Sequence, residues 1–208
     1  MAHRKHMKHV GAIGAIAAVL ALMLTNSPKG KAQGGGDDSE SKIQRGFAIA
    51  PVPLNLVGKN RSLVGLGSYL VNAVQGCNGC HHGPPSEFAP GGDPYQGQPK
   101  RINQPGYLAG GTPLFGPVLL PRNLTPDKTG RPEGGASFEE FRQIMRTGLD
   151  PDHAHPQFGP YLQVMPWSFF QDMTEHDLRA IYEYLSAIPC VEGDPGLPNP
   201  RPIGTRCK

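Results

Sequence analysis

The sequence has 208 residues, of which 28 are Gly and 23 are Pro, so these two residue types make up about a quarter of the chain. This composition excludes a chain that is helical throughout, because both residue types disfavour helix interiors. With 18% charged and 38% hydrophobic residues, it also excludes a highly charged disordered chain. Only 7% of the residues are aromatic, which predicts a thin core that another component helps to fill.

The positive charge of the chain lies at its beginning. The formal net charge is +3, but residues 1–32 hold five Lys and Arg residues and no Asp or Glu. The remaining residues hold 15 basic and 17 acidic side chains, a net charge of −2. A basic stripe that binds nucleic acid is therefore not predicted, and we expect no nucleic-acid partner.

Residues 1–32 have the pattern of a signal peptide or an N-terminal anchor. Arg4, Lys5 and Lys8 precede 16 apolar and small residues at positions 10–25. This run suits the central part of a secretory signal and is shorter than the ~20 residues that span a bilayer. Small residues at positions −3 and −1 predict cleavage after Ala32. An uncleaved membrane anchor is the alternative, and the rest of the chain is exported in both cases.

Residues 33–60 are predicted to connect this leader to a folded domain. Residues 28–41 are polar and rich in Gly, as in flexible linkers. Residues 46–58 are largely apolar, but Pro51 and Pro53 exclude a helix, so we expect an extended strap that lies on the domain.

Hydrophobic periodicity predicts an all-α domain with three helices, at residues 61–76, 137–147 and 174–188. Ser137 and Glu140 form a capping box at the start of the second helix. Thr174 and Asp177 cap the third helix. Residues 83–136 are rich in Gly and Pro, and a loop of this length in a compact domain is expected to wrap something.

Cys77, Cys80 and His81 form the motif C-x-x-C-H, which is the attachment signature of c-type haem. On a helical turn, residues i, i+3 and i+4 lie on one side. Two thiols at this spacing can form thioether bonds with the two vinyl groups of a porphyrin, and the adjacent imidazole can bind the iron. We therefore predict one covalent haem c, attached through Cys77 and Cys80, with His81 as the proximal iron ligand.

Two other kinds of site use cysteines at this spacing. A C-x-x-C redox pair needs no following His and is typical of a βαβ context, which this helical, Pro-rich sequence lacks. A zinc site needs a second pair of ligands, and Cys190 and Cys207, with 16 residues between them, fit that role poorly. Haem attachment therefore explains the motif best.

Several further segments agree with one family. They are Gly67-x-Tyr69-Leu70-Val71, Asn123-Leu124-Thr125-Pro126-Asp127 with Gly130, Phe141 with Arg146-Thr147-Gly148, Met165-Pro166-Trp167, and Asp177-Leu178-x-x-Ile181-x-x-Tyr184-Leu185. Over residues 61–189 the sequence resembles bacterial class I c-type cytochromes, and most closely the mono-haem domains in cytochrome subunits of periplasmic dehydrogenases.

The resemblance implies an all-α cytochrome c fold, with three or more helices and long loops around one haem. It also implies a location in the periplasm or at the outer face of the cytoplasmic membrane. In this family the first and last helices cross closely, with a small residue against an aromatic one. Gly65 or Gly67 is the expected small residue, and Tyr182 or Tyr184 is the expected aromatic residue.

The family binds the second side of the haem iron with the Met of a Met-Pro pair, and Met165 occupies that position in a Pro-bounded loop. A Met ligand raises the reduction potential relative to two imidazoles and saturates the iron. Met145 and Met173 lie at positions that favour packing. The competing imidazoles are those of His82, His153, His155 and His176. His153 and His155 form a loop cluster whose role the sequence leaves open.

Arg122, Asn123 and Trp167 are candidate contacts of the haem propionates. A half-buried carboxylate needs hydrogen-bond donors, and all three side chains carry N–H groups. For Trp167, simple space filling is an equal alternative.

Residues 190–208 form a C-terminal tail that departs from the family pattern. Its two cysteines, Cys190 and Cys207, are the pair that remains after haem attachment. In an oxidising compartment they are expected to form one disulfide, which closes the Pro- and Gly-rich tail.

The predicted function is single-electron transfer, with no catalytic residues. A saturated iron favours electron transfer over oxygen or peroxide chemistry. We expect redox proteins as partners, with a dehydrogenase or membrane complex as the donor and an oxidase or another cytochrome as the acceptor. The alternatives are a haem enzyme with a displaceable distal ligand, or an electron-accepting subunit docked permanently to a dehydrogenase.

Overall fold

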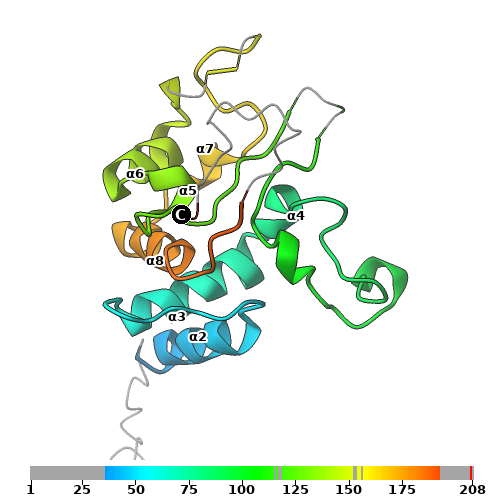
Figure 1. The fold of residues 1–208 in the computed structure, drawn as a ribbon. Coiled ribbons are helices and arrows are strands. Elements are labelled where there is room, and N and C mark those ends of the chain that lie inside the picture. Colours follow the sequence, from blue (N-terminus) through cyan, green and yellow to red (C-terminus); the bar gives the residue numbers. More distant parts are fainter. Residues whose placement is uncertain are drawn as a thin grey trace, which may run out of the picture. The chain divides into compact units, whose positions relative to one another are not determined.

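The computed structural model describes residues 36–114, 116, 119–151, 154–155, 157–192 and 207. The predicted leader at residues 1–32 lies outside the described residues, as do His153 and most of the C-terminal tail. Over the described residues the chain is mainly helical and has isolated β-bridges but no strand (Figure 1). No helix in this part of the chain is both long and apolar enough to cross a membrane. The architecture is therefore that of an all-α protein.

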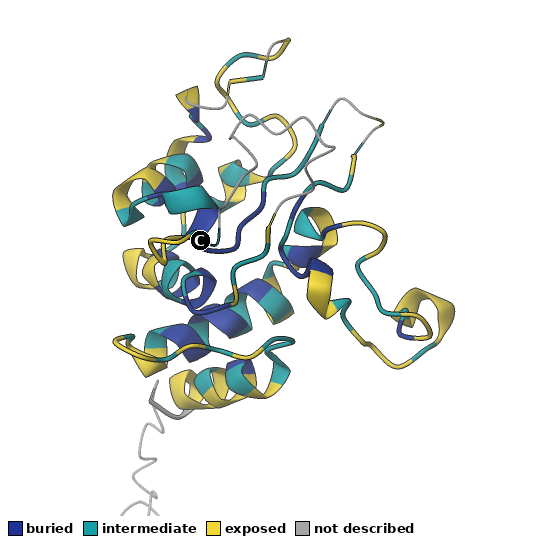
Figure 2. Ribbon diagram, in the orientation of Figure 1, coloured by how far each residue is buried: buried dark blue, intermediate teal, exposed yellow. Residues whose placement is uncertain are grey.

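Helices α3 (Arg61–Tyr69) and α8 (Glu175–Leu185) cross at close range. A Cβ atom on Gly67 would overlap the carbonyl oxygen of Ala180 and would lie 2.7 Å from the Cβ atom of Tyr184. Figure 2 shows buried residues gathered where the two helices meet. The small and aromatic residues at this crossing are therefore Gly67 and Tyr184.

The ends of these two helices differ slightly from the prediction. Asn60 caps α3 by accepting a hydrogen bond from the N–H group of Leu63. The last turn of the helix predicted at 61–76 is a π-helix, η1 (Leu70–Val74), in which the turns are wider. Thr174 caps α8 as predicted, but the helix ends at Leu185 and the chain continues in a turn.

Helix α2 (Gly36–Ile49) shows that the linker and strap predicted within residues 33–60 are wrong for the part that it covers. Ile43 and Phe47 lie one turn apart and pack on α3, where a Cβ atom on Gly65 would lie 2.7 Å from both side chains. The hydroxyl of Ser68 donates a 2.7 Å hydrogen bond to the carbonyl oxygen of Gly46. Packing of one helix face against α3 outweighs the poor helix propensity of this Gly-containing segment.

The rest of the predicted strap has no helix, in agreement with its two prolines. The N–H group of Asn55 donates a 2.8 Å hydrogen bond to the carbonyl oxygen of Ala187, just beyond α8. Three apolar side chains of the strap pack against the core, namely Val52, Leu54 and Leu56.

Helix α6 (Phe138–Thr147) ends where predicted and begins one residue later, with Ser137 as its cap. Ser137 and Glu140 form the expected capping box, and Gly148 ends the helix at a φ angle of +65°. The ring of Phe138 meets that of Tyr182 edge to face at a centroid distance of 5.4 Å. Tyr182 therefore joins α8 to α6 and does not lie at the Gly67 crossing.

The first part of the Gly- and Pro-rich region at 83–136 forms a long loop that extends from the rest of the domain and returns to it. It contains the short helices η2 (Pro94–Gln96), η3 (Gln104–Gly106) and α5 (Pro132–Gly135). A 2.7 Å hydrogen bond from the N–H group of Gly83 to the carbonyl oxygen of Gly106 closes the base of an excursion that Figure 1 shows in green at the right. The chain thus comes back beside helix α4 (Asn78–His81), which carries the C-x-x-C-H motif.

The described part of the C-terminal tail is anchored in two ways. Cys190 and Cys207 form a disulfide, as expected from the sequence, with their Cα atoms 5.6 Å apart. The amide of Asn123 donates to the carbonyl oxygen of Val191 at 2.9 Å. The N–H group of Val191 donates to the hydroxyl of Thr125 at 3.0 Å.

Candidate haem-attachment site

Helix α4 is a single turn, and Cys77 is the residue that precedes it. The N–H groups of Cys80 and His81 both donate to the carbonyl oxygen of Cys77, at 3.3 and 2.9 Å. This turn gives the two thiols and the imidazole the helical spacing that puts them on one side. Cys77 is half-buried, whereas Cys80 is exposed.

A backbone hydrogen bond orients the imidazole of His81. Its Nδ1 atom lies 2.8 Å from the carbonyl oxygen of Arg122. Because a carbonyl oxygen can only accept, Nδ1 carries the proton, and the lone pair of the neutral ring is on Nε2. Histidines that bind a metal through one ring nitrogen are held in this way by the other. His81 therefore fits the role of the proximal iron ligand.

Burial lowers the pKa of His81 below its usual 6.5, and the hydrogen bond to Arg122 acts in the opposite direction. The unfolded chain binds this proton near pH 6.5, whereas the folded chain without haem binds it only at lower pH. We therefore expect the free energy of unfolding to fall as the pH drops below about 6.5. Because only one proton is involved, the free energy of unfolding changes by at most about 1.4 kcal/mol per pH unit.

Urea unfolding of the chain without haem, repeated between about pH 5 and 7.5, measures this dependence. The matched control is His81→Gln, which keeps a polar side chain but cannot titrate in this range. A pH dependence as steep in the variant as in the parent would contradict the assignment.

Cys77 does not have the properties of a redox-active thiol. Burial raises the pKa of the Cys77 thiol to about 12, so the thiol is neutral at physiological pH. The attacking Cys of a C-x-x-C redox pair has a lowered pKa. The disulfide between Cys190 and Cys207 also occupies the two other cysteines that a zinc site would use. Both alternatives to haem attachment are therefore weakened.

Two buried tyrosines and Asn72 form a closed hydrogen-bond ring, which we call the polar ring. The hydroxyl of Tyr107 donates to Oδ1 of Asn72 at 2.6 Å. Because this uses the only hydroxyl proton of Tyr107, Tyr184 is the donor in the 2.8 Å bond between the two hydroxyls. Nδ2 of Asn72 closes the ring by donating to the hydroxyl of Tyr184 at 3.1 Å. Burial is the main cause that raises the pKa of both tyrosines, and Cys77 contributes in each case.

The segment at residues 107–110 also binds the motif directly. The N–H group of Leu108 donates to Oδ1 of Asn78 at 2.9 Å, and that of Gly110 donates to the carbonyl oxygen of His81 at 2.7 Å. Leu108 has a φ angle of +55°, a left-handed conformation that costs energy for a residue other than Gly. The segment therefore contacts the chain both before and after Cys77.

The side chain of Arg122 lies between two carboxylates. It forms ion pairs with Asp150 and with Glu133, the latter at 3.8 Å, and these carboxylate side chains are only 5% and 6% exposed. Arg122 therefore orients His81 through its carbonyl oxygen and binds protein carboxylates through its guanidinium. Its contact with a haem propionate stays a prediction.

The other two candidate propionate contacts also bind protein groups. The Asn123 side chain accepts from the N–H and hydroxyl groups of Thr125, at 2.8 and 2.7 Å, in addition to its bond to the tail. The indole N–H of Trp167 donates to the carbonyl oxygen of Leu162 at 3.1 Å, and its ring lies against Gly148. Trp167 thus has the packing role that the sequence offered as an alternative. The propionate contacts of both residues stay predictions.

Met165 directly precedes Pro166 and helix α7 (Trp167–Phe170). It is half-buried and packs against the same core cluster as Cys77. Met145 is buried in this core, and the sulfur of Met173 accepts a 3.2 Å hydrogen bond from Gln75. Met165 is therefore the best candidate for the distal ligand among these three methionines, and its bond to iron stays a prediction.

The competing imidazoles within the described residues make other contacts. Nδ1 of His82 lies 3.2 Å from the carbonyl oxygens of both Asn78 and Gly79. The ring of His155 stacks on Phe158 at a centroid distance of 4.6 Å. His176 is exposed at the start of α8 and lies 3.8 Å from the carboxylate of Asp177.

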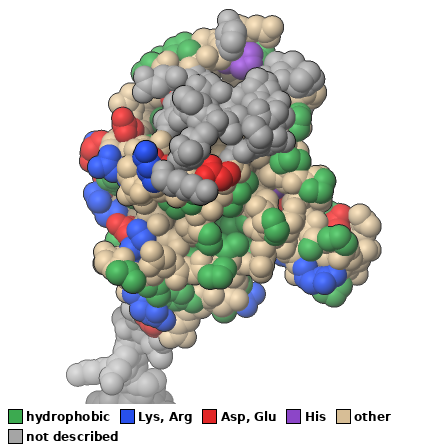
Figure 3. Space-filling model, in the orientation of Figure 1, with side chains coloured by type: hydrophobic (Ala, Val, Ile, Leu, Met, Phe, Trp, Pro, Cys, Tyr) green, Lys and Arg blue, Asp and Glu red, His purple; other side chains and the backbone are tan. Residues whose placement is uncertain are grey.

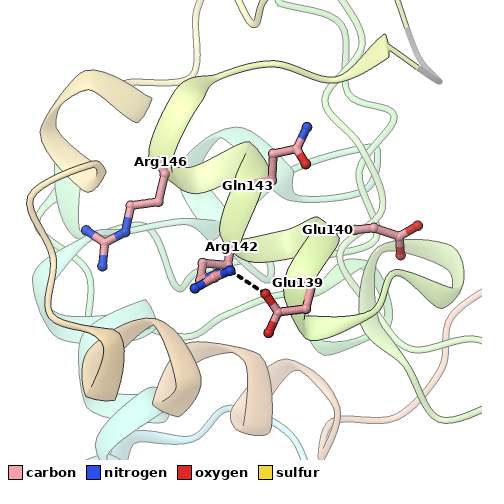
Figure 4. A pocket seen from close by; sticks show the side chains of 5 residues that line it. All are labelled: Glu139, Glu140, Arg142, Gln143 and Arg146. Atoms are coloured by element: carbon pink, nitrogen blue, oxygen red, sulfur yellow. Dashed lines mark ion pairs between the residues drawn. The ribbon is translucent and has the colours of Figure 1, made fainter.

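A surface pocket lies away from the motif, on the exposed side of α6. Its lining residues are Glu139, Glu140, Arg142, Gln143 and Arg146 (Figure 4). Both arginines lie 3.7 Å from carboxylate oxygens of Glu175, so their charges are paired. Figure 1 shows α6 and α4 well apart, and we assign this pocket no part in haem binding.

Charge is mixed on the face of the protein drawn in Figure 3, where Lys and Arg side chains lie among acidic and polar ones. Within the described ranges, no group of three or more His, Cys, Asp or Glu side chains is placed to hold a metal ion.

Comparisons with known protein families, with curated proteins and with solved structures find no match to this chain. The likeness to c-type cytochromes therefore rests on the residues quoted for it.

Sequence reasoning missed the residues outside the motif that hold it in place, namely Asn72, Tyr107, Glu133 and Asp150. None of them belongs to a motif with a recognisable spacing. Tyr107 and Asn72, for example, are 35 residues apart and meet only in the folded chain.

Proposed function

We propose that the protein is a mono-haem c-type cytochrome that transfers single electrons between redox proteins on the outer side of the cytoplasmic membrane. In this proposal Cys77 and Cys80 would hold the haem covalently, and His81 and Met165 would bind its iron. The observation that carries the proposal is the C-x-x-C-H motif on helix α4, together with the hydrogen bond that fixes Nδ1 of His81. When bound, the haem supplies one-electron chemistry.

The protein's own residues have three tasks in this function. The carbonyl oxygen of Arg122 fixes the tautomer and orientation of His81. The buried apolar side chains packed around Cys77 limit the access of water, which influences the reduction potential. Met165 would bind the iron on the side opposite His81 and would so keep small molecules from it.

Production of the full chain in a bacterium that attaches c-type haem tests the proposal. We expect one haem per chain, which acidified acetone does not extract because it is bound covalently. We also expect reversible one-electron reduction and a six-coordinate iron in both oxidation states. The envelope fraction should contain the protein, because the leader predicts export.

The matched control replaces both attachment residues, Cys77→Ala with Cys80→Ala, and is expected to release all haem to acetone. A parent protein that carries no covalent haem would refute the proposal. Rapid binding of carbon monoxide by the reduced parent protein would instead favour a haem enzyme with a displaceable distal ligand.

A further inference from the structure

One dipeptide holds the chain on both sides of Cys77. Tyr107 binds the side chain of Asn72 at 2.6 Å, five residues before this cysteine. The next residue, Leu108, binds the side chain of Asn78 at 2.9 Å, one residue after it. Leu108 has a left-handed backbone conformation. Strained conformations of this kind cluster at functional sites.

The chain reaches Cys77 through a wide turn in which Asn72 is the central residue. The N–H group of Gln75 donates to the carbonyl oxygen of Leu70 at 2.9 Å, and that of Cys77 donates to Val71 at 3.2 Å. Such π-type turns are frequent at functional sites. Asn72 lies in the middle of the turn, and its side chain binds Ser68 in addition to both tyrosines. The position of this side chain therefore influences where Cys77 lies.

We infer that the polar ring of Asn72, Tyr107 and Tyr184 is a positioning device that holds the Cys77 thiol for thioether formation; the inference rests on the proposed function. In this step the Cys77 thiol adds across a vinyl double bond. A C–S bond and a C–H bond form, while the S–H bond and the π bond break. The thiol hydrogen moves to the vinyl group, so no oxidant or reductant is needed.

The two cysteines differ in their dependence on this support. Cys80 is exposed, lies within α4 and is carried by the helical turn itself. Cys77 lies before the helix, at the end of a wide turn whose central residue, Asn72, is held by the polar ring. Small displacements of a reacting group have large effects on rate, so loss of the ring should impair attachment at Cys77 selectively.

Tyr107→Phe tests the inference, because it removes one hydroxyl and keeps the ring of the side chain. We expect the fraction of chains with a single thioether bond, through Cys80 only, to rise about tenfold. A remaining vinyl group shifts the main absorption band of the reduced pyridine adduct to longer wavelength. Alkylation of free thiols followed by mass spectrometry should then find the label on Cys77.

Tyr182→Phe is the matched control, because Tyr182 lies on the same helix as Tyr184 and donates a 2.9 Å hydrogen bond to the carbonyl oxygen of Ala136. This variant also loses a tyrosine hydrogen bond, but we expect two thioether bonds to form. A second test variant, Tyr184→Phe, opens the ring and keeps the Tyr107–Asn72 bond, so it should show a weaker form of the same defect. Equal thioether patterns in all three variants would overturn the inference.

Failure of the proposed function gives a different result, namely a parent chain without covalent haem. The inference is then decided on the chain without haem that carries Cys80→Ser. There Tyr107→Phe should raise the alkylation rate of Cys77 severalfold above that of the Tyr182→Phe variant, since the ring no longer fixes Cys77. Equal alkylation rates would refute a positioning role.

Discussion

Met165→Ala is expected to convert a closed electron-transfer site into one that binds external ligands. The parent protein should show the weak red absorption band of a methionine–iron bond in its ferric form, and the variant should lack it. The reduced variant should bind carbon monoxide, because one axial position is open. Loss of the thioether ligand should also lower the midpoint potential by on the order of 0.1 V. Absorption spectra and a redox titration measure these changes.

Met173→Ala is the matched control for this prediction. Met173 is also half-buried and lies near the same core, but its sulfur already accepts a hydrogen bond from Gln75. We expect the red band and the midpoint potential of the Met173→Ala variant to equal those of the parent. An unchanged spectrum in Met165→Ala, or loss of the red band in Met173→Ala, would show that Met165 is not the ligand.

Gly67→Val is expected to destabilise the fold more than other single changes on α3. A side chain here would overlap the backbone carbonyl of Ala180, so α3 and α8 would have to separate. Overpacking against a rigid backbone should lower the free energy of unfolding by about 3 kcal/mol or more. Urea unfolding followed by helical circular dichroism measures this change.

Ser62→Val places the same side chain on the exposed side of the same helix. The free energy of unfolding should then change by no more than about 0.5 kcal/mol. If both valine variants unfold at the same urea concentration, α3 and α8 do not cross at Gly67 in solution.

Local sequence chemistry predicts some elements well. The boundaries of α6 follow from Ser137, Glu140 and Gly148, whose side-chain and backbone preferences act within one helical turn. Helix α2 was missed because its stability comes from packing on Gly65 of another helix. A signal was present, since Ile43 and Phe47 have helical spacing, but the surrounding glycines and charges favoured a linker.

The candidate site also has a part that local sequence predicts and a part that only the folded chain reveals. Cys77, Cys80 and His81 are adjacent in the sequence, so their spacing alone indicates the chemistry. The group that orients His81 is a backbone carbonyl, and a carbonyl has no residue type that a sequence could reveal. The polar ring joins Asn72 to Tyr184 across 112 residues, so only the folded chain brings them together.

This long separation also bears on how the protein folds during synthesis. Helix α3 is made early, but α8, its main packing partner, is among the last helices to be made. Contacts between distant segments form slowly, because a large loop has to close first. The growing chain therefore cannot complete its core until α8 has been synthesised. Such a delay would suit the export that we propose, because a translocation channel admits unfolded chains.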